Sequence, residues 1–413
     1  MAYHILLVVL ALLAAALLAP ALVLLVECLA APARPAPPPR DESPPPRVAI
    51  LIPAHDEEGQ IGATVEGLAA ELREGDRLVV IADNCGDSTA SVVRGIGSQR
   101  ALPAVSVIER RDPTKIGKGF AISFGVEHLE ADPPDVVVLV DADCRVTPGA
   151  IGELARTARR TGGPVQGEYL LASRPGSSPL SRISELALLV RNRVRPRGLA
   201  RLGLPCLLTG SGMAFPWRVL HDAPETRSNL VEDMVLGLEL ALRGNPPRSC
   251  VSAQISSELP TENRAAHKQR RRWEHGQLHT LVTYVPRLLV AGLARRDVGL
   301  LALAAELSVP PLALLVILQA LLVLASGVPL IFWPAFSVAP LALSLAGVAA
   351  TALAVGVAWS RFARSVVPAS TLLLVPFYVA WKLPLYGLLL LKGKQRTWER
   401  TARPGEGPER GSP

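Results

Sequence analysis

The apolar residues of this chain are grouped in two different ways. Three long runs without a charged residue, at residues 5–26, 311–332 and 339–358, are each long enough to cross a bilayer as a helix. From residue 47 to about residue 290 the apolar runs are short and are separated by polar stretches, as in a soluble domain. The pattern therefore predicts a soluble domain inserted between membrane helices.

Short runs rich in β-branched residues predict the strands of the soluble domain. They lie at residues 48–53, 77–82, 105–109 and 136–140. Stretches that are predicted to be helical follow these runs, for example an amphipathic one that ends near Leu72 and another at residues 120–129. Because strands that alternate with helices are typical of βαβ units, the predicted fold class is α/β with a parallel sheet.

Basic residues beside the first apolar run predict its orientation. Arg34, Arg40 and Arg47 follow this run, so the positive-inside rule places the soluble domain in the cytoplasm of a multi-pass protein of the cell membrane. A cleaved signal peptide is the alternative, because residues 30–33 resemble a cleavage site. The apolar run is longer than that of a signal peptide, however, and no basic residue precedes it.

The carboxyl-terminal part leaves the number of spans open. Residues 370–391 are apolar but contain Lys382 and two prolines, which fits a broken span or an interfacial helix. If residues 370–391 formed a third full span after the soluble domain, the basic tail would lie outside. We therefore expect an interfacial last segment or an extra short span near residues 300–309. The predicted parts are a transmembrane helix (1–30), a Pro-rich linker (31–46), the soluble domain (47–290), transmembrane or interfacial helices (298–392) and a cytoplasmic or disordered tail (393–413).

Composition excludes several classes of protein. The mean hydropathy of +0.31 is high for a purely soluble chain, which agrees with the predicted spans. The net charge is +7, but basic and aromatic residues are not interleaved, so we expect no nucleic-acid partner. The five cysteines are scattered and odd in number, which argues against a disulfide framework or a zinc site and fits a reducing compartment.

Acidic residues follow two of the predicted strands. Asp141 and Asp143 follow the fourth strand, and in an extended chain their side chains would project to the same side. This edge of a parallel sheet is where ligands bind, and two carboxylates could share one Mg²⁺ or Mn²⁺ ion. Asp83 follows the second strand at the same edge. The alternatives are a solvated loop for the Asp pair and a helix N-cap for Asp83.

Lys118 and Asp233 are candidates for binding and catalysis. Lys118 ends a basic, Gly-containing loop and is predicted to contact phosphate at the same edge of the sheet. Asp233 lies at the start of a predicted helix, residues 234–242, where a carboxylate is ordinarily a partner of the helix dipole. If Asp233 faces the cleft, it is instead a candidate base for a hydroxyl proton. The glycine turn at residues 208–215 would let the backbone approach a ligand closely.

A basic and aromatic motif follows further along the chain. Gln269, Arg272 and Trp273 would share one face of a helix. An arginine can hold a diphosphate with two hydrogen bonds, and an indole ring can form the floor of a sugar site. The alternative is a stripe that faces solvent or lipid headgroups.

The order of these motifs resembles that of one enzyme family. Membrane-integrated family 2 glycosyltransferases, which include cellulose synthase, hyaluronan synthase, bacterial exopolysaccharide synthases and ceramide glucosyltransferase, carry similar motifs in the same order. The resemblance covers about residues 47–290 and implies a GT-A fold, an inverting mechanism and a UDP-sugar donor held through Mg²⁺ or Mn²⁺. The residues that carry it are Pro53-x-x-x-Glu57-Glu58, Asp83, Asp141-x-Asp143, Glu232-Asp233 and Gln269-x-x-Arg272-Trp273.

The resemblance also implies a role for each of these residues. Asp83 would contact the uracil, Asp141 the donor nucleotide and the metal, Asp143 the metal, and Asp233 would be the general base. The donor site would further include Glu57, Lys118 and Arg272, and the acceptor site Glu232, Gln269 and Trp273. The chain departs from the family pattern at Val231, where Thr is usual, and after Asp83, where it reads Asn-Cys-Gly-Asp.

The predicted function is transfer of a sugar from a UDP-sugar to a growing polysaccharide or a membrane-associated glycan. Export or assembly proteins and membrane lipids are the further partners expected for such an enzyme. Single transfer to a lipid acceptor is the first alternative. A nucleotidyltransferase and a non-catalytic membrane scaffold are the others.

Overall fold

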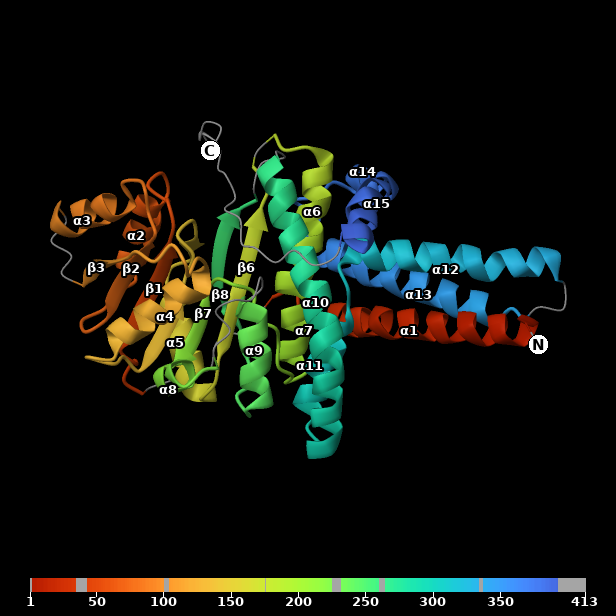
Figure 1. The fold of residues 1–413 in the computed structure, drawn as a ribbon, viewed down its shortest axis with the longest axis horizontal. Helices are drawn as coiled ribbons and strands as arrows, with labels where there is room; N and C mark the ends of the chain where they lie inside the picture. Colours follow the sequence, from red (N-terminus) through yellow and green to blue (C-terminus); the bar gives the residue numbers. More distant parts are fainter. Residues whose placement is uncertain are drawn as a thin grey trace.

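The computed structural model shows a mixed α/β sheet domain from which a bundle of long helices projects (Figure 1). It describes residues 2–34, 43–99, 104–174, 176–224, 232–259, 264–333 and 337–392, and the statements below concern these residues. Helices α1, α12 and α13 run side by side away from the sheet, whereas α10 and α11 lie across the base of this bundle.

The sheet has eight strands in the order β3-β2-β1-β4-β7-β6-β8-β5 within the described part of the chain. Strands β1 to β4 pair in parallel, which confirms the prediction from the alternating pattern. The strands are β1 (Val48–Ala54), β2 (Arg77–Asp83), β3 (Val105–Arg110), β4 (Val136–Leu139), β5 (Arg145–Val146), β6 (Val165–Ala172), β7 (Met213–Pro216) and β8 (Arg248–Glu258).

The second half of the sheet departs from the parallel arrangement. Strand β7 is antiparallel to both β4 and β6, so it lies in the middle of the sheet. In the sequence this segment shows only the signal of a glycine turn, residues 208–215. A strand of four residues is too short to show a period, and its place in the sheet depends on distant partners.

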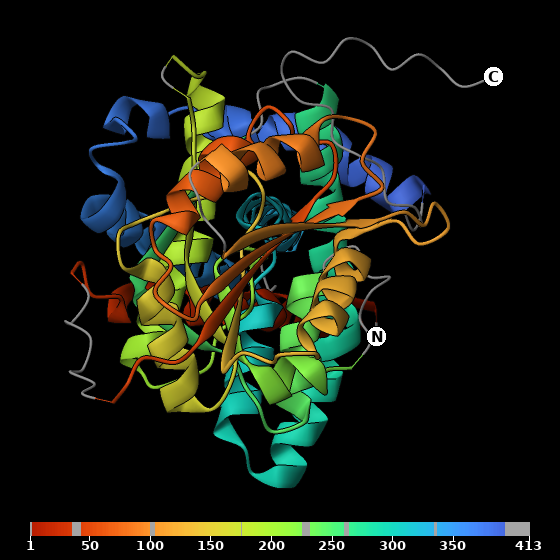
Figure 2. The same cartoon turned by 90° about the vertical axis from the view of Figure 1, so that its left-hand side faces the viewer.

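Helices cover both faces of the sheet, which explains why β1 and β4 are apolar throughout. Ile50 and Ile52 of β1 pack in one cluster with α2, α3 and α5, whereas Ala49 and Leu51 pack on the other face with α4. Figure 2 shows α3 and α4 on opposite sides of the strands. The helices of this domain are α2 (Ile61–Ala69), α3 (Thr89–Gln99), α4 (Lys118–Leu129), α5 (Ala150–Thr161), α8 (Trp217–His221) and α9 (Glu232–Leu242).

Three helices of the described residues are long and apolar enough to cross a membrane, at His4–Ala30, Leu312–Phe332 and Ala339–Ala363. They correspond to the three long runs of the sequence. Helices α11 and α15 are shorter apolar helices, and Figure 1 shows both outside the long bundle. The remaining elements are α1 (Ala2–Ala30), α6 (Pro179–Leu189), η1 (Val190–Val194), α7 (Arg195–Arg201), α10 (Arg264–Arg295), α11 (Val298–Ser308), α12 (Leu312–Phe332), α13 (Ala339–Ala358), η2 (Trp359–Ala363), α14 (Ala369–Leu372) and α15 (Val375–Lys392).

Helix α7 joins the sheet to α1, the first of the long apolar helices. Its Arg195 donates to the carboxylate of Glu27 in α1 over 2.5 Å, and both side chains are buried. Two residues on, Arg197 pairs with the buried carboxylate of Glu168 in β6 and donates to the backbone oxygen of Ala33 over 2.8 Å. A buried charge that loses its partner is strongly destabilising, so these pairs fix how α1 meets the sheet.

The backbones of α1 and α7 also meet closely. A Cβ atom added to Gly198 in α7 would lie 2.0 Å from the carbonyl oxygen of Glu27. No side chain fits there, so this position of the two helices requires glycine.

We expect Gly198→Ala to separate α1 from α7 and to lower the free energy of unfolding by about 1–3 kcal/mol, as overpacking typically does. The matched control is Gly95→Ala, because a Cβ on this glycine of α3 would meet nothing within 4 Å. That change should stabilise the protein by about 0.5–1 kcal/mol, since alanine loses less backbone entropy in a helix. Thermal unfolding of both variants in detergent checks the prediction, and a Gly198→Ala variant as stable as the parent would contradict it.

Candidate active site

A cavity of about 290 Å³ lies at the carboxyl end of the parallel strands. Loops after β1, β2 and β4 form one side of it, and the glycine turn, α9 and α10 form the other. Seven of the sequence-predicted residues have described side chains that line it: Glu57, Asp83, Lys118, Asp141, Asp143, Asp233 and Trp273. This is the position at which open α/β sheets bind ligands.

Asp141 and Asp143 come together beyond the end of β4. Their carboxylate oxygens and the sulfur of Cys144 lie within 4.8 Å of one another. The chain is not extended at Asp141 and Asp143 as predicted, because β4 ends at Leu139 and residues 142–143 form a turn. The turn nevertheless brings the two carboxylates together, and Ser257 of β8 donates to Asp143 over 3.1 Å. Ser257 was not predicted, since its contact depends on a strand that is distant in sequence.

The charges in this cavity do not balance among its central residues. Lys118 Nζ lies 2.5 Å from Asp141 Oδ1, and two more carboxylates, those of Asp143 and Asp233, face Asp141. Burial raises the pKa of Asp141, Lys118 lowers it, and the two carboxylates raise it further. Hard divalent cations prefer oxygen ligands, so the Asp141–Asp143 pair, with its excess of negative charge, fits Mg²⁺ or Mn²⁺.

The glycine turn holds Asp233 and Lys118 close to the acid pair. Lys118 donates to the backbone oxygen of Gly210 over 2.6 Å. Gly210 has a φ of +100°, and a Cβ there would lie 3.1 Å from Asp233 Oδ2. Gln166 of β6 fixes the turn, because it donates to Ser211 O over 2.8 Å and accepts from the backbone N–H of Thr209 over 2.8 Å. Gln166 was also missed, because a single Gln in a strand gives no signal.

Asp83 lies at the far end of the cavity, where its carboxylate already has a partner. Arg110 Nη1 lies 2.5 Å from Asp83 Oδ1. Burial raises the pKa of Asp83, and Arg110 partly offsets this. The N-cap alternative is wrong, because α3 begins at Thr89 and its first N–H donates to Asp87 over 2.9 Å. Glu57 is near the same end and receives its structural support from Thr89, whose hydroxyl accepts from the Glu57 N–H over 2.7 Å.

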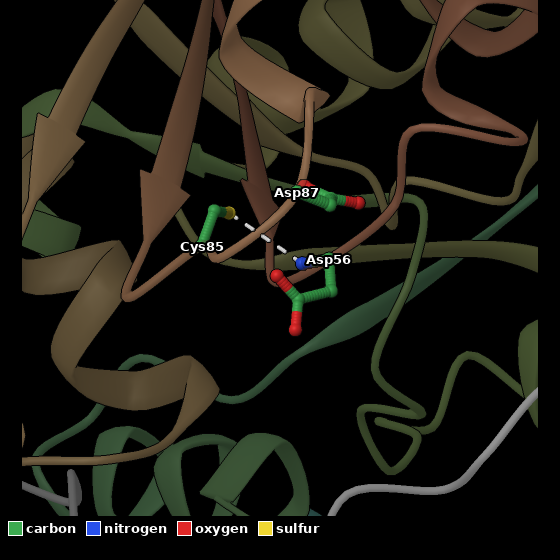
Figure 3. A group of neighbouring side chains, drawn as sticks. All are labelled: Asp56, Cys85 and Asp87. Carbon is green, nitrogen blue, oxygen red and sulfur yellow. Dashed lines mark hydrogen bonds between the residues drawn. The ribbon is translucent and has the colours of Figure 1, made fainter. Parts of the chain in front are cut away.

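A second group of acids lies beside this end of the cavity. Asp56, Cys85 and Asp87 bring their ligand atoms within 4.8 Å of one another, and the Asp56 N–H contacts the Cys85 sulfur over 3.5 Å (Figure 3). Asp56 accepts from the N–H of Gly86 over 2.7 Å, and Asp87 from that of Glu58 over 3.0 Å. These bonds tie the loop after β1 to the loop after β2, which accounts for the acids without a metal.

The motif on α10 is only partly described. Trp273 lines the cavity together with Arg191 of η1 and Asn192. The side chains of Glu232, Gln269 and Arg272 lie outside the described part of the structure. Arg191 was not predicted, although the alternating arginines at 191, 193, 195 and 197 would have been a reason to examine this segment.

One solved structure resembles the chain over nearly its whole length. The mannosyltransferase PcManGT from Pyrobaculum calidifontis, solved in complex with GDP-Man and Mn²⁺, aligns with a TM-score of 0.53 and 20% identity. The alignment covers 91% of this chain and 99% of that chain. At this identity the likeness shows the fold, and it confirms the predicted GT-A class of sheet with flanking apolar helices.

Two further structures are less similar. GalNAc-T7 with UDP, GalNAc and Mn²⁺ aligns with a TM-score of 0.40 and 13% identity, over 56% of this chain and 48% of that chain. TarS of S. aureus, residues 1–349, aligns with a TM-score of 0.37 and 13% identity, over 57% and 64%. No curated protein sequence matches the chain.

The sequence profile described as "Glycosyltransferase like family 2" matches residues 45–276, which is more than half of the 413-residue chain. The match contains every element that contributes an acid to the cavity. The match excludes the alternative function of a nucleotidyltransferase, which the sequence motifs left open. The chain therefore belongs to glycosyltransferase family 2 and is a transferase of glycosyl groups.

Proposed function

We propose that this enzyme transfers a sugar from a UDP-sugar to a hydroxyl group at the cytoplasmic surface of the membrane, with inversion at the anomeric carbon. The observation that carries the proposal is the meeting of Asp141, Asp143, Lys118 and Asp233 in one cavity at the carboxyl edge of the sheet. This reaction needs carboxylates that hold a divalent cation, a positively charged side chain that binds phosphate, and a carboxylate that takes the proton of the acceptor.

The donor would lie along the edge of the sheet. Glu57 and Asp83 line the end assigned to the nucleoside, and Asp141, Asp143 and Lys118 line the end assigned to the diphosphate. Arg272 is proposed as a further diphosphate ligand. A Mg²⁺ or Mn²⁺ ion held by Asp141 and Asp143 would act as a Lewis acid for the leaving diphosphate. The related fold of PcManGT was solved with GDP-Man and Mn²⁺, so UDP- and GDP-sugars both belong in the test.

The acceptor would enter from the side of Asp233 and Trp273. The Asp233 carboxylate takes the proton of the acceptor hydroxyl as its oxygen forms a bond to the anomeric carbon. The bond from that carbon to the diphosphate oxygen breaks, and UDP leaves with the bonding electrons. Lys118 lies where negative charge grows on the leaving group, and such stabilisation acts on the transition state. Glu232, Gln269 and Trp273 are proposed to bind the acceptor.

The membrane arrangement supports this location. Among the described residues three helices could span the membrane, and α11 and α15 lie at the base of their bundle. This arrangement fits an interfacial last segment, which keeps the basic tail on the cytoplasmic side. We propose a multi-pass protein whose transferase domain is cytoplasmic, where nucleotide sugars are made. The acceptor is a membrane-associated glycan, a growing polysaccharide or a lipid, with export or assembly proteins as further partners of a polymer synthase.

Asp143→Ala should lose the metal-dependent part of donor binding, because it removes one of two proposed cation ligands. We expect UDP to bind at least about tenfold more weakly than to the parent in Mn²⁺, a typical cost of disturbing a metal site. Without Mn²⁺ the variant should bind UDP no more weakly than the parent, because it has also lost a carboxylate that repels the diphosphate. Calorimetric titration with and without Mn²⁺ measures this, with Asp222→Ala as the control because Asp222 is 74% exposed.

Asp233→Asn should abolish transfer while donor binding is kept, because a base is needed only for the chemical step. We expect a loss of about 10²–10⁴-fold in kcat, the usual contribution of general-base catalysis. UDP release from a panel of UDP- and GDP-sugars with membranes as acceptor measures kcat, and titration of UDP with Mn²⁺ measures binding. Normal turnover of this variant would show that Asp233 is not the base.

Gly210→Ala should lower transfer much more than stability, because its Cβ would lie 3.1 Å from Asp233 Oδ2. The matched control is Gly162→Ala at the end of α5, since Gly162 also has a positive φ (+67°) but a Cβ there meets nothing within 4 Å. Both changes carry a backbone cost of about 1–2 kcal/mol. Only Gly210→Ala should reduce kcat, by at least about tenfold, and equal activity of the two variants would contradict this.

A further inference from the structure

A second cavity adjoins the active site on the side of the membrane helices. It has a volume of about 170 Å³ and lies between α6, α10, α12 and α15. Leu188, Arg191 and Trp273 line both cavities. The two spaces are therefore neighbours, separated by side chains that belong to both.

The walls of this second cavity are mainly apolar and come from membrane helices. Val316 belongs to α12 and Val355 to α13, two helices long and apolar enough to span a bilayer. Val375 and Val379 of α15 and Ile183 of α6 line it as well. The cavity thus leads from the reaction centre into the part of the molecule that would meet the acyl chains of lipids.

The polar groups at this cavity are largely engaged with one another. Lys382 of α15 pairs with Glu274 of α10. The hydroxyls of Ser184 in α6 and Tyr378 in α15 lie 3.0 Å apart. These contacts join the three helices around the cavity and leave aliphatic side chains as its free surface. A sugar polymer placed here would lose hydrogen bonds to water without replacement, whereas an alkyl chain would not.

The junction of the two cavities is polar. Arg191 faces the carboxylates of Asp233, Glu274 and Glu306 and the guanidinium of Arg195. Asp233 lines the active-site cavity beside it. A molecule that extends through both cavities would thus have a polar group at Asp233 and an apolar group between α6, α12 and α15.

We propose that the acceptor is an amphipathic lipid with a hydroxyl in its head group, and that the second cavity holds its alkyl chain. This inference rests on the proposed function and selects one of the acceptors that the sequence left open. The described residues contain three helices that could span the membrane, which are few to enclose a channel for a polymer. The junction at Arg191 and Trp273 would place the head-group hydroxyl beside Asp233.

Two tryptophan substitutions on one helix test the proposal. Val316→Trp fills the second cavity from α12. Leu321→Trp is the matched control on the same helix, because Leu321 is 57% exposed and does not line the cavity. Val379→Trp fills the cavity from α15 and provides a second variant should the first fail to fold. Titration of UDP with Mn²⁺ shows that each full-length variant keeps its donor site.

The assay incubates membranes containing each full-length protein with radiolabelled UDP- and GDP-sugars and then separates lipids by organic extraction. We expect the label in the organic phase for the parent and for Leu321→Trp, and at least a tenfold loss for Val316→Trp and Val379→Trp with UDP binding unchanged. Label in a water-soluble or precipitable polymer would overturn the lipid acceptor but leave the transferase function intact. Equal lipid labelling by every variant would overturn the cavity assignment. If no sugar nucleotide in the panel led to release of UDP or GDP, the proposed function would be overturned, and this inference with it.

Discussion

Two buried arginines of α7 hold the transferase domain against the membrane bundle. Arg195 pairs with Glu27 of α1, a residue 168 positions earlier in the chain, and Arg197 pairs with Glu168 of β6. Each pair removes two charges from water, so neither partner can leave without a large cost in free energy. The backbone contact at Gly198, the residue after Arg197, limits how closely α1 and α7 can be packed with any larger residue. These contacts therefore fix where the sheet domain lies relative to the long apolar helix α1.

The same helical segment also forms the boundary between the two cavities. Residues 179–201 run without a break through α6, η1 and α7. Leu188 and Arg191 lie on this segment at the junction of the cavities, and both precede Arg195 in the sequence. A π-helical turn shifts the following residues around the helix axis, and such turns are frequent at functional sites. The contacts that anchor the domain therefore lie on the same helical segment as the residues between the two cavities.

The sequence could predict those parts of the molecule whose signals are local. The short runs rich in β-branched residues that form β1 to β4, and the acids after β2 and β4, can be recognised within windows of a few residues. The pairing of Asp143 with Ser257, the support of the glycine turn by Gln166 and the place of β7 depend on residues that are distant in sequence. The arginines of α7 could be seen in the sequence, but charged residues in a helix are normally exposed. Only the fold shows that these arginines are buried and which carboxylates pair with them.

The charges of the proposed donor site imply that donor and divalent cation bind together. Asp141, Asp143 and Asp233 face one another with Lys118 as the nearest cation, and burial already raises the pKa of Asp141. A diphosphate that arrives alone would meet these carboxylates at close range and be repelled. A donor accompanied by a divalent cation brings the positive charge that the acids require, so the two should bind cooperatively. The apolar cavity has no such requirement, because its walls are mainly aliphatic and its Lys382 pairs with Glu274 within the protein. Donor affinity should therefore depend on cation concentration, whereas occupation of the apolar cavity should depend on the length of an alkyl chain.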